Sequence, residues 1–382
     1  NEYLRVVSGL PQHSCAFRHD NLPVFASARY PDCGRSASLT LSSSAMGKHA
    51  EKFRNLAAHF FSDSHLFHPQ NGAAAKHLLM LYATRAPYIV ENGDTIDFDE
   101  ITALLKGKGM AVEEFPRKIK DLLEEIGAAE IHLRQIDTLL WHAAEGRNVV
   151  VIGGNHDPGF DRLAGENIHG ITCKTEDIYD AGKKRGRFLV EHGHRFDPAF
   201  LQHYSGLYGI GSRILSHGLR IDQGISVVVP SLREAFPVSN ALKALGKQYV
   251  KSFRRKAIDK VVETQMDGII CGHIHRQDQR NIKIFKGAKE KRLYINSGDG
   301  LTHGTSSAHT EVGEWIDLKA KHVPAKACAI LAARNPLRQF RAHSLRFLQA
   351  AWDAQLQTLP RAATAEANSA QTRKTPDLRL VG

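Results

Sequence analysis

The sequence predicts an α/β fold, a layered domain in which helices cover a sheet. Two observations predict it. Short apolar runs bounded by Gly, Asp and Asn recur along the chain, and a long segment with apolar residues at helical spacing lies among them. The composition agrees, because 42% of the 382 residues are hydrophobic, enough for a buried core. Strands that alternate with helices are typical of such domains.

Six apolar runs are predicted to be strands: Leu56–Phe61, Tyr88–Val90, Val149–Ile152, Phe188–Val190, Gly268–Ile270 and Leu293–Ile295. The second run is interrupted before Gly93 by two polar residues, Glu91 and Asn92. A helix that ends at Gly146 is predicted between the second and third runs. Its apolar positions are Ile119, Leu122, Leu123, Ile126, Leu133, Ile136, Leu139, Leu140 and Ala143.

The two ends of the chain lack this alternation. We expect residues 1–50 to be a poorly ordered extension, with Met46 as a candidate start of the folded part. The alternative is an ordered extension packed on the core. Residues 51–320 are expected to form the main domain, residues 321–358 a basic amphipathic helix, and residues 359–382 a disordered tail.

The charge and the cysteines of the chain indicate its kinds of partner and its redox compartment. The 51 Lys and Arg exceed the 40 Asp and Glu, so the formal net charge is +11. This excess favours anionic partners, namely phosphorylated substrates, nucleic acid or an anionic membrane surface. The five cysteines are scattered and odd in number, which fits a reducing compartment. Because no secretory signal or spanning run is recognisable, we expect a cytoplasmic location.

Polar residues stand where the predicted strands end. Asp63, Asp94, Asn155, His192 and His273 each follow an apolar run by a few residues. In open α/β sheets, ligands bind at the carboxyl ends of the strands. Five loops are therefore expected to meet in one site.

These residues belong to five short motifs: Asp63-Ser64-His65, Gly93-Asp94-Thr95-Ile96-Asp97, Gly154-Asn155-His156-Asp157, His192-Gly193-His194 and Gly272-His273-Ile274-His275. One motif alone is weak, because 21 histidines make chance pairs common. In this order, the set resembles the calcineurin-like metallophosphoesterase superfamily over residues 57–300. The resemblance implies a four-layer α/β/β/α sandwich with a helical cap insertion at residues 198–262. It also implies an enzyme that hydrolyses phosphoesters.

The residue types suit that chemistry. Hydrolysis of a phosphoester needs a nucleophilic hydroxide, neutralisation of the phosphate oxygens and help for the leaving group. Two divalent cations supply the first two, and carboxylate, imidazole and amide ligands suit Mn, the ion expected here, or Fe or Zn. The resemblance implies that Asp94 bridges two cations. The other ligands would be Asp63, His65 and His275 for one cation, and Asn155, His192 and His273 for the other.

The resemblance also assigns roles to residues that do not bind metal. His156 is expected beside the phosphate, where it stabilises charge or protonates the leaving oxygen. Asp157 is expected to orient the His156 imidazole, and Asp97 to support the bridging carboxylate. The role of His194 is open between a residue of the site and an exposed loop histidine.

Within the superfamily, the chain looks like the branch of UDP-2,3-diacylglucosamine pyrophosphatases. The features are Ser62-Asp63-Ser64-His65-Leu66, Gly154-Asn155-His156-Asp157, His192-Gly193-His194-Arg195-Phe196-Asp197 and Asn296-Ser297-Gly298-Asp299. This branch cleaves the pyrophosphate of a UDP-sugar lipid precursor at an inner-membrane surface. The resemblance thus implies a phosphorylated small-molecule or lipid-linked substrate and peripheral membrane contact. Two positions depart from the branch. Its best-known members have Arg in place of His156, so this chain resembles the subset with Asn-His-Asp, whose substrates are less uniform. That subset often has Trp in place of Gly300.

Two basic segments leave alternatives open. The expected cap either takes acyl chains and phosphates or is an ordinary amphipathic helical pair. Residues 319–346, which contain no Asp or Glu, either lie on an anionic membrane or dock on the catalytic domain. Two further functions remain: a nucleotide or protein phosphatase on the same site, and a non-catalytic basic scaffold. No RNA-binding or zinc-finger motif is recognisable, so nucleic acid is not an expected partner.

Overall fold

The computed structural model describes residues 53, 55–68, 73–111, 129–183, 185–197, 237–298, 300–301, 303–319, 322–323 and 337–358. All of them belong to the unit Met46–Gly382. The predictions for residues 1–50 and 359–382, and for most of the cap at 198–262, lie outside the described residues.

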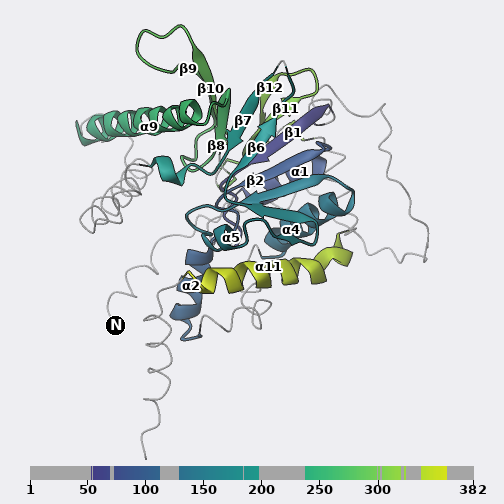
Figure 1. The fold of residues 1–382 in the computed structure, drawn as a ribbon. Helices are drawn as coiled ribbons and strands as arrows, with labels where there is room; N and C mark the ends of the chain where they lie inside the picture. The colour runs from purple at the N-terminus through teal and green to yellow at the C-terminus, as the bar shows by residue number, and fades with distance from the viewer. Residues whose placement is uncertain are drawn as a thin grey trace, which may run out of the picture. The chain divides into compact units, whose positions relative to one another are not determined.

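Two mixed sheets form the centre of this unit (Figure 1). The seven-stranded sheet has the order β12-β11-β1-β2-β3-β5-β4. Its strands are β1 (Leu56–Phe61), β2 (Tyr88–Asn92), β3 (Asn148–Ile152), β4 (Asn167–Ile168), β5 (Ile171–Lys174), β11 (Thr305–Thr310) and β12 (Trp315–Lys319). The five-stranded sheet has the order β6-β7-β8-β10-β9. Its strands are β6 (Asp177–Asp180), β7 (Arg187–Val190), β8 (Gly268–Cys271), β9 (Asp278–Lys283) and β10 (Lys291–Asn296).

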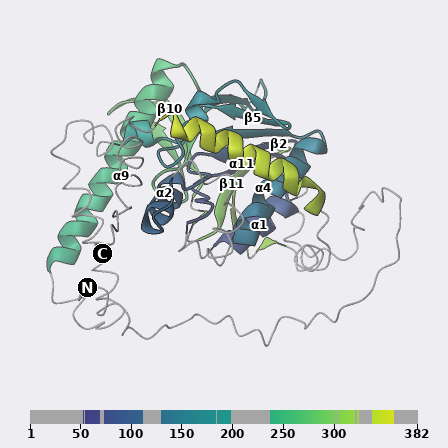
Figure 2. The same ribbon diagram turned by 90° about the horizontal axis from the view of Figure 1, so that it is seen from below.

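The sheets pack face to face through one apolar layer to which both contribute. Phe60 and Val150 come from the first sheet, and Val190, Ile270 and Ile295 come from the second; all five are fully buried. Helices α1 (Ala74–Ala83), α4 (Ala129–Ala144) and α11 (Arg341–Leu356) cover the seven-stranded sheet (Figure 2). Helix α9 (Pro237–Glu263) covers the five-stranded sheet. The arrangement confirms the predicted sandwich fold.

The predicted strands are all present, and each is as long as expected or extended by up to three residues. The described part of the predicted helix corresponds to α4, which packs on α1 through buried Leu133, Ile136 and Leu140. The predicted positions Ile119, Leu122, Leu123 and Ile126 lie outside the described residues. A second short helix, α2 (Phe98–Gly107), begins directly after the second motif. Its N-cap is Asp97, whose side chain accepts a hydrogen bond from the backbone N–H of Glu100 at 3.1 Å.

Helix α11 is docked on the domain. Phe347, Leu348 and Trp352 are fully buried against α4 and the short helix α5 (Gly159–Arg162). Gln355 accepts a hydrogen bond from the backbone N–H of Gly159 at 2.8 Å. Helix α11 is therefore docked, and its apolar face is not available to a membrane. Residues 320–321 and 324–336 of the basic segment lie outside the described residues, so both alternatives stay open there.

Among the described helices, none is both long and apolar enough to cross a membrane.

Candidate metal centre

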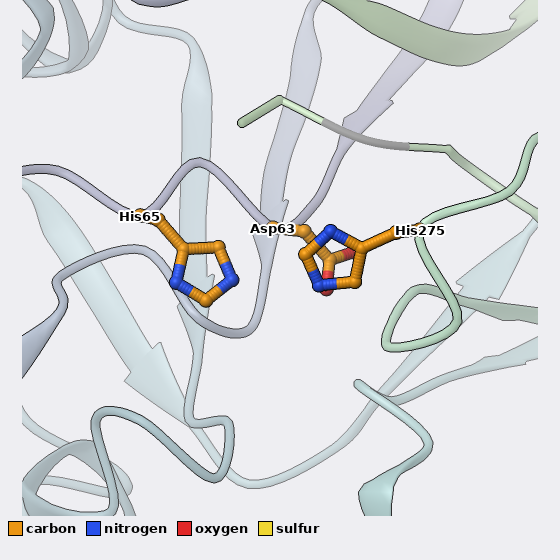
Figure 3. A group of neighbouring side chains, drawn as sticks. All are labelled: Asp63, His65 and His275. Atoms are coloured by element: carbon orange, nitrogen blue, oxygen red, sulfur yellow. The ribbon is translucent and has the colours of Figure 1, made fainter. Parts of the chain in front are cut away.

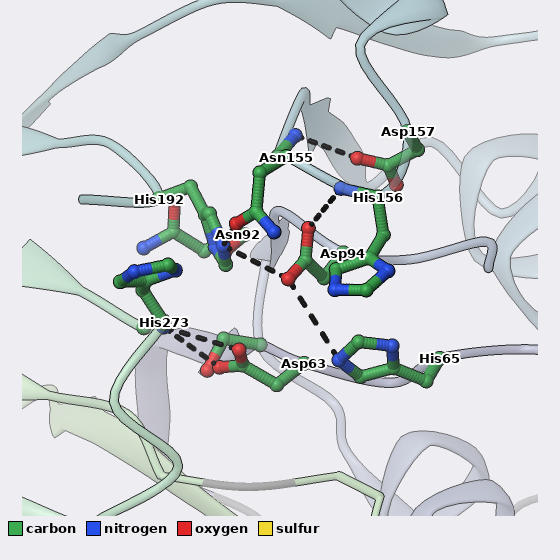
Figure 4. A network of polar contacts seen from close by, with 12 residues as sticks. Asp63, His65, Asn92, Asp94, Asn155, His156, Asp157, His192 and His273 are labelled. Carbon is green, nitrogen blue, oxygen red and sulfur yellow. Dashed lines mark hydrogen bonds and ion pairs between the residues drawn. The ribbon is translucent and has the colours of Figure 1, made fainter. Parts of the chain in front are cut away.

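The residues that follow five strands lie together at one edge of the two sheets (Figure 4). The first ligand group consists of Asp63, His65 and His275, whose ligand atoms lie within 4.8 Å of one another (Figure 3). The Nε2 atom of His275 is 3.4 Å from Oδ1 of Asp63. These are the three residues that the resemblance assigned to one cation.

The second ligand group consists of Asp94, His192 and His273, again within 4.8 Å of one another. Asn155 adjoins it, since its Oδ1 atom lies 3.3 Å from Nε2 of His192. The Nδ1 atom of His192 donates to the backbone carbonyl of Asn92 at 2.9 Å, so Nε2 is the nitrogen that can bind a cation once it has lost its own proton. All seven predicted ligands are therefore in one of the two groups or beside it.

Asp94 joins the two groups. Its Oδ2 atom is 3.1 Å from Nε2 of His192 and 3.7 Å from Nε2 of His65. Burial alone would raise the pKa of Asp94, but the charge and hydrogen bond of His192 and the charges of two more histidines hold it well below its usual value. Burial likewise lowers the pKa of His192, but the Asp94 carboxylate outweighs it and raises that pKa to about 9. The geometry fits the bridging position expected for Asp94.

The backbone of the site is strained. Among the described residues, eight that are not glycine have a positive φ. Five of these eight are predicted ligands: Asp63 (53°), His65 (41°), Asp94 (51°), His273 (71°) and His275 (47°). A left-handed conformation costs L-residues free energy, so it persists only where the surrounding structure holds it. Here it turns the ligand side chains toward a common centre.

Two glycines allow the ligands to approach the backbone. A Cβ atom on Gly154 would lie 2.2 Å from Oδ1 of Asp94, and one on Gly93 would lie 2.2 Å from the His192 ring. Gly93 also has a φ of +83°. Any side chain at either position would therefore displace a ligand of the second group.

The His156 imidazole has a different acidic partner from the one expected. Its Nδ1 atom lies 3.4 Å from Asp97 and 3.7 Å from Asp99. Asp97 also lies 2.9 Å from Nδ1 of His65, so it supports two imidazoles of the site. Burial lowers the pKa of His156, but the hydrogen bond to Asp97 and the carboxylate charges outweigh it and raise the pKa to about 10.

Asp157 stabilises the loops. Its carboxylate accepts hydrogen bonds from the backbone N–H groups of Gly154 at 2.6 Å, Thr95 at 2.6 Å and Ile96 at 3.1 Å. It thus connects the second and third motifs. A carboxylate accepts hydrogen bonds and backbone N–H groups donate them, so an Asp at this position can hold the two loops together. The role expected for Asp157, to orient the His156 imidazole, stays a prediction.

His194 is buried, with 9% of its surface exposed, so it is not an exposed loop histidine. Its ring centroid lies 5.6 Å from that of His192. Burial and the neighbouring histidines lower the pKa of His194 to about 3.

A buried polar cluster, for which the sequence predicts no function, lies beneath the first ligand group. Glu91 accepts a hydrogen bond from Ser64 at 2.7 Å and contacts His77 at 2.9 Å. The side chain of Asn92 donates to the carbonyls of Glu191 and Ile270, both at 3.2 Å. The signal was present in the sequence, because two polar residues in succession interrupt an otherwise buried strand.

The donor set fits divalent cations. Imidazole nitrogens, carboxylate oxygens and one amide oxygen are the ligands that Mn, Fe and Zn take in proteins. Each ligand group supplies three donors, from two loops in the first group and three in the second, and Asp94 is shared. The fold and the site together define a layered α/β protein with a metal-binding centre of phosphoesterase type.

The chain belongs to the calcineurin-like phosphoesterase family, which matches residues 58–277. Proteins of this family use divalent metal ions, and membership in it supports phosphoester hydrolysis as the general activity. A comparison with curated proteins finds no match.

Solved structures give distant likenesses. A single mutant of Vps29 from Entamoeba histolytica is 12% identical, covers 69% of this chain and 99% of its own, and has a TM-score of 0.29. Vps29 from Cryptosporidium parvum is 10% identical, with coverage of 68% and 94% and a TM-score of 0.29. A conserved uncharacterised protein, a predicted phosphoesterase from Streptococcus pneumoniae, is 12% identical, with coverage of 69% and 97% and a TM-score of 0.26. TM-scores this low carry no argument about function.

Proposed function

We propose that this protein is a hydrolase that cleaves a phosphoester or pyrophosphate bond with a pair of divalent cations. The observation that carries the proposal is the shared carboxylate of Asp94, within 3.7 Å of a ligand nitrogen in each group. The first ligand group would hold one cation, and the second group with Asn155 would hold the other. When bound, such a pair activates water and neutralises phosphate charge.

The chain itself supplies the remaining help at the phosphate. The His156 side chain is 34% exposed, whereas the ligands Asp94 and His192 are almost fully buried, so its imidazole can meet a substrate. The carboxylates of Asp97 and Asp99 lie 3.4 and 3.7 Å from Nδ1 of His156, and their negative charges favour the protonated imidazole. A protonated imidazole at this place can neutralise a phosphate oxygen or donate a proton to the leaving oxygen.

For the substrate, we propose a UDP-linked pyrophosphate of the lipid-precursor type. The support is the resemblance of the motifs from Ser62 to Asp197 to the pyrophosphatase branch. A nucleotide or protein phosphatase remains the second candidate, because the described site is common to both reactions. Gly300, where the Asn-His-Asp subset of the branch often has Trp, leaves no room for a side chain, since a Cβ atom would lie 2.9 Å from Nδ1 of His77.

The test is a side-by-side assay of Mn-loaded protein on a bis-ester, a monoester and a UDP-linked pyrophosphate. Activity should vanish with a chelator and return with Mn²⁺. Asp94→Ala should abolish turnover of every substrate and lower metal content, whereas the exposed control Asp180→Ala should change neither. Wild-type protein that binds two cations but hydrolyses none of the substrates would instead support the non-catalytic scaffold.

We also propose peripheral contact with an anionic membrane, through the turn between β9 and β10 rather than through α11. Phe285 in this turn is 58% exposed. Exposed lysines surround it in the sequence: Lys283, Lys286, Lys289 and Lys291. The acidic residues of the hairpin, Asp278 and Glu290, are each paired with arginine. An aromatic side chain among lysines suits a surface of anionic lipid headgroups.

Sedimentation with vesicles tests this contact. Vesicles rich in phosphatidylglycerol should bind the protein and neutral phosphatidylcholine vesicles should not. Binding should fall in Phe285→Ser and in Lys286→Glu, but not in Val312→Ser, which alters a residue 76% exposed in another turn. Equal sedimentation of all variants, or preference for single-stranded RNA over anionic vesicles, would overturn the proposal. The cytoplasmic location stays a prediction.

A further inference from the structure

Asp197, which lies three residues after the fourth motif, contacts the predicted ligand His273. The Oδ2 atom of Asp197 lies 2.9 Å from Nε2 of His273. An ionised carboxylate only accepts hydrogen bonds, so this contact requires the proton on Nε2. The lone pair of the ring is then on Nδ1, the nitrogen left for a cation in the second ligand group.

Helix α9 reaches the same pair of residues. The hydroxyl of Tyr249 hydrogen-bonds the Asp197 carboxylate. Burial, followed by the charge of Asp197, raises the pKa of Tyr249, so this hydroxyl keeps its proton and acts as the donor. Tyr249 is partly buried and Asp197 is 8% exposed, so water competes little for the bond.

One turn further along α9, Phe253 packs on the histidine itself. The rings of Phe253 and His273 are stacked, with centroids 6.0 Å apart and an interplanar angle of 19°. Phe253 is fully buried and lies so near Gly193 that a Cβ atom there would be 2.9 Å from its Cζ. Residues four apart share one face of a helix, so Tyr249 and Phe253 act on the site together.

We propose that α9 positions a metal ligand: Tyr249 fixes Asp197, and Asp197 fixes the tautomer and orientation of His273. Tyr249 and Asp197 are positioning residues, since neither belongs to the two ligand groups. The cation affinity of the second ligand group therefore depends on the docking of α9. This inference rests on the proposed function only in that the second ligand group binds a cation.

Metal titration tests the inference. Calorimetric titration of the full chain with Mn²⁺ should resolve two sites in the wild type. Asp197→Asn should weaken one site about 10- to 100-fold. Tyr249→Phe should weaken the same site by less than about 10-fold, because it removes one neutral donor. The matched control is Tyr88→Phe, which removes a hydrogen bond of the same kind, from Tyr88 to Asp177 at 2.6 Å, outside the ligand groups.

A double variant separates positioning from general destabilisation. If Tyr249 acts through Asp197, then Tyr249→Phe should have no further effect on affinity in the Asp197→Asn background. A further loss of the same size there, or unchanged affinity in both single variants that remain folded by circular dichroism, overturns the inference.

The ring tautomer gives a second readout that needs neither metal nor activity. Nitrogen NMR of ¹⁵N-histidine-labelled, metal-free protein should show the Nε2–H form of His273, identified by its absence in His273→Gln, and a mixture of forms in Asp197→Asn. An Nδ1–H form in the wild type overturns the inference. Failure of hydrolysis with this tautomer intact would instead count against the proposed function alone.

Discussion

Glu91 lies 2.9 Å from Nε2 of His77 inside the domain, and both residues have 1% of their surface exposed. Glu91 also accepts the hydroxyl of Ser64, the residue between the ligands Asp63 and His65. A buried carboxylate is costly unless hydrogen bonds satisfy it. The cluster therefore ties the loop of the first ligand group to β2 and α1.

Glu91→Gln should reduce the free energy of unfolding by about 1–3 kcal/mol, because the amide cannot accept from both donors. We also expect weaker Mn²⁺ binding at the first ligand group, measured by titration. Glu145→Gln, which alters an exposed residue, is the control and should shift stability by less than about 0.5 kcal/mol. Equal behaviour of the two variants would show that the cluster does not support the loop.

His156→Ala should leave both cations bound and the fold intact, because no ligand is removed. Turnover should fall about 10²–10⁴-fold, the usual range for general acid–base help. Steady-state kinetics together with metal analysis measures both quantities. Wild-type turnover in this variant would remove His156 from the reaction.

Asp157→Ala should act on stability, in contrast to His156→Ala. Three backbone N–H groups lose their acceptor, and a buried unsatisfied donor costs about 1–3 kcal/mol. We therefore expect the free energy of unfolding to fall by at least about 2 kcal/mol in chemical denaturation. A stable Asp157→Ala with low turnover would instead favour the original expectation, in which Asp157 orients the imidazole.

The strands that the sequence predicted are those with apolar runs, and five of the six lead into the five motifs. Strand β11 has the sequence TSSAHT, with no such run, yet it pairs with both β1 and β12. Its polar side chains can be buried because they form hydrogen bonds across the sheet. One of these joins Oγ of Ser306 to Nε2 of His59 at 2.7 Å. Such partners are fixed by tertiary pairing, which a local pattern does not reveal.

The ligands were predictable because each follows a strand within a recognisable motif. The contact by which Asp197 orients His273 was not predictable, since the two residues are separated by 76 positions in the chain. The same limit explains Asp157: its neighbour in the sequence is His156, but its partners in space are backbone groups of another loop. The spacing of the motifs reveals which side chains can bind a cation, whereas the orientation of those side chains depends on how the folded chain packs around them.

The docking of α11 makes a further prediction. Trp352 is fully buried, and its ring packs against Phe98 with centroids 5.4 Å apart. Trp352→Ala should cost about 3–5 kcal/mol of stability, the range for large aromatic residues in a core. Leu345→Ala, on the exposed side of α11, is the control and should cost far less. If both variants unfold at the same denaturant concentration as the wild type, α11 does not contribute to the fold.

His142 should make the domain sensitive to acid. Its Nε2 donates to the carbonyl of Leu81 at 2.7 Å, while Nδ1 accepts from Arg147 at 2.9 Å, so the ring must be neutral. Burial is the main cause that lowers the pKa of His142 to about 3. The unfolded chain titrates near the ordinary value of about 6.5, so the unfolded state binds the extra proton below that pH.

Stability should therefore be unaffected by His142 above about pH 6.5 and should fall as the pH drops toward 3, by about 1.4 kcal/mol per pH unit. The free energy of unfolding, measured at pH 7.5, 6.5 and 5.5, should decline less steeply in His142→Gln than in the wild type. His303→Gln, which alters an exposed histidine, is the control and should keep the wild-type slope. Identical slopes in all three proteins would mean that the buried imidazole already carries a proton, against the geometry of its two hydrogen bonds.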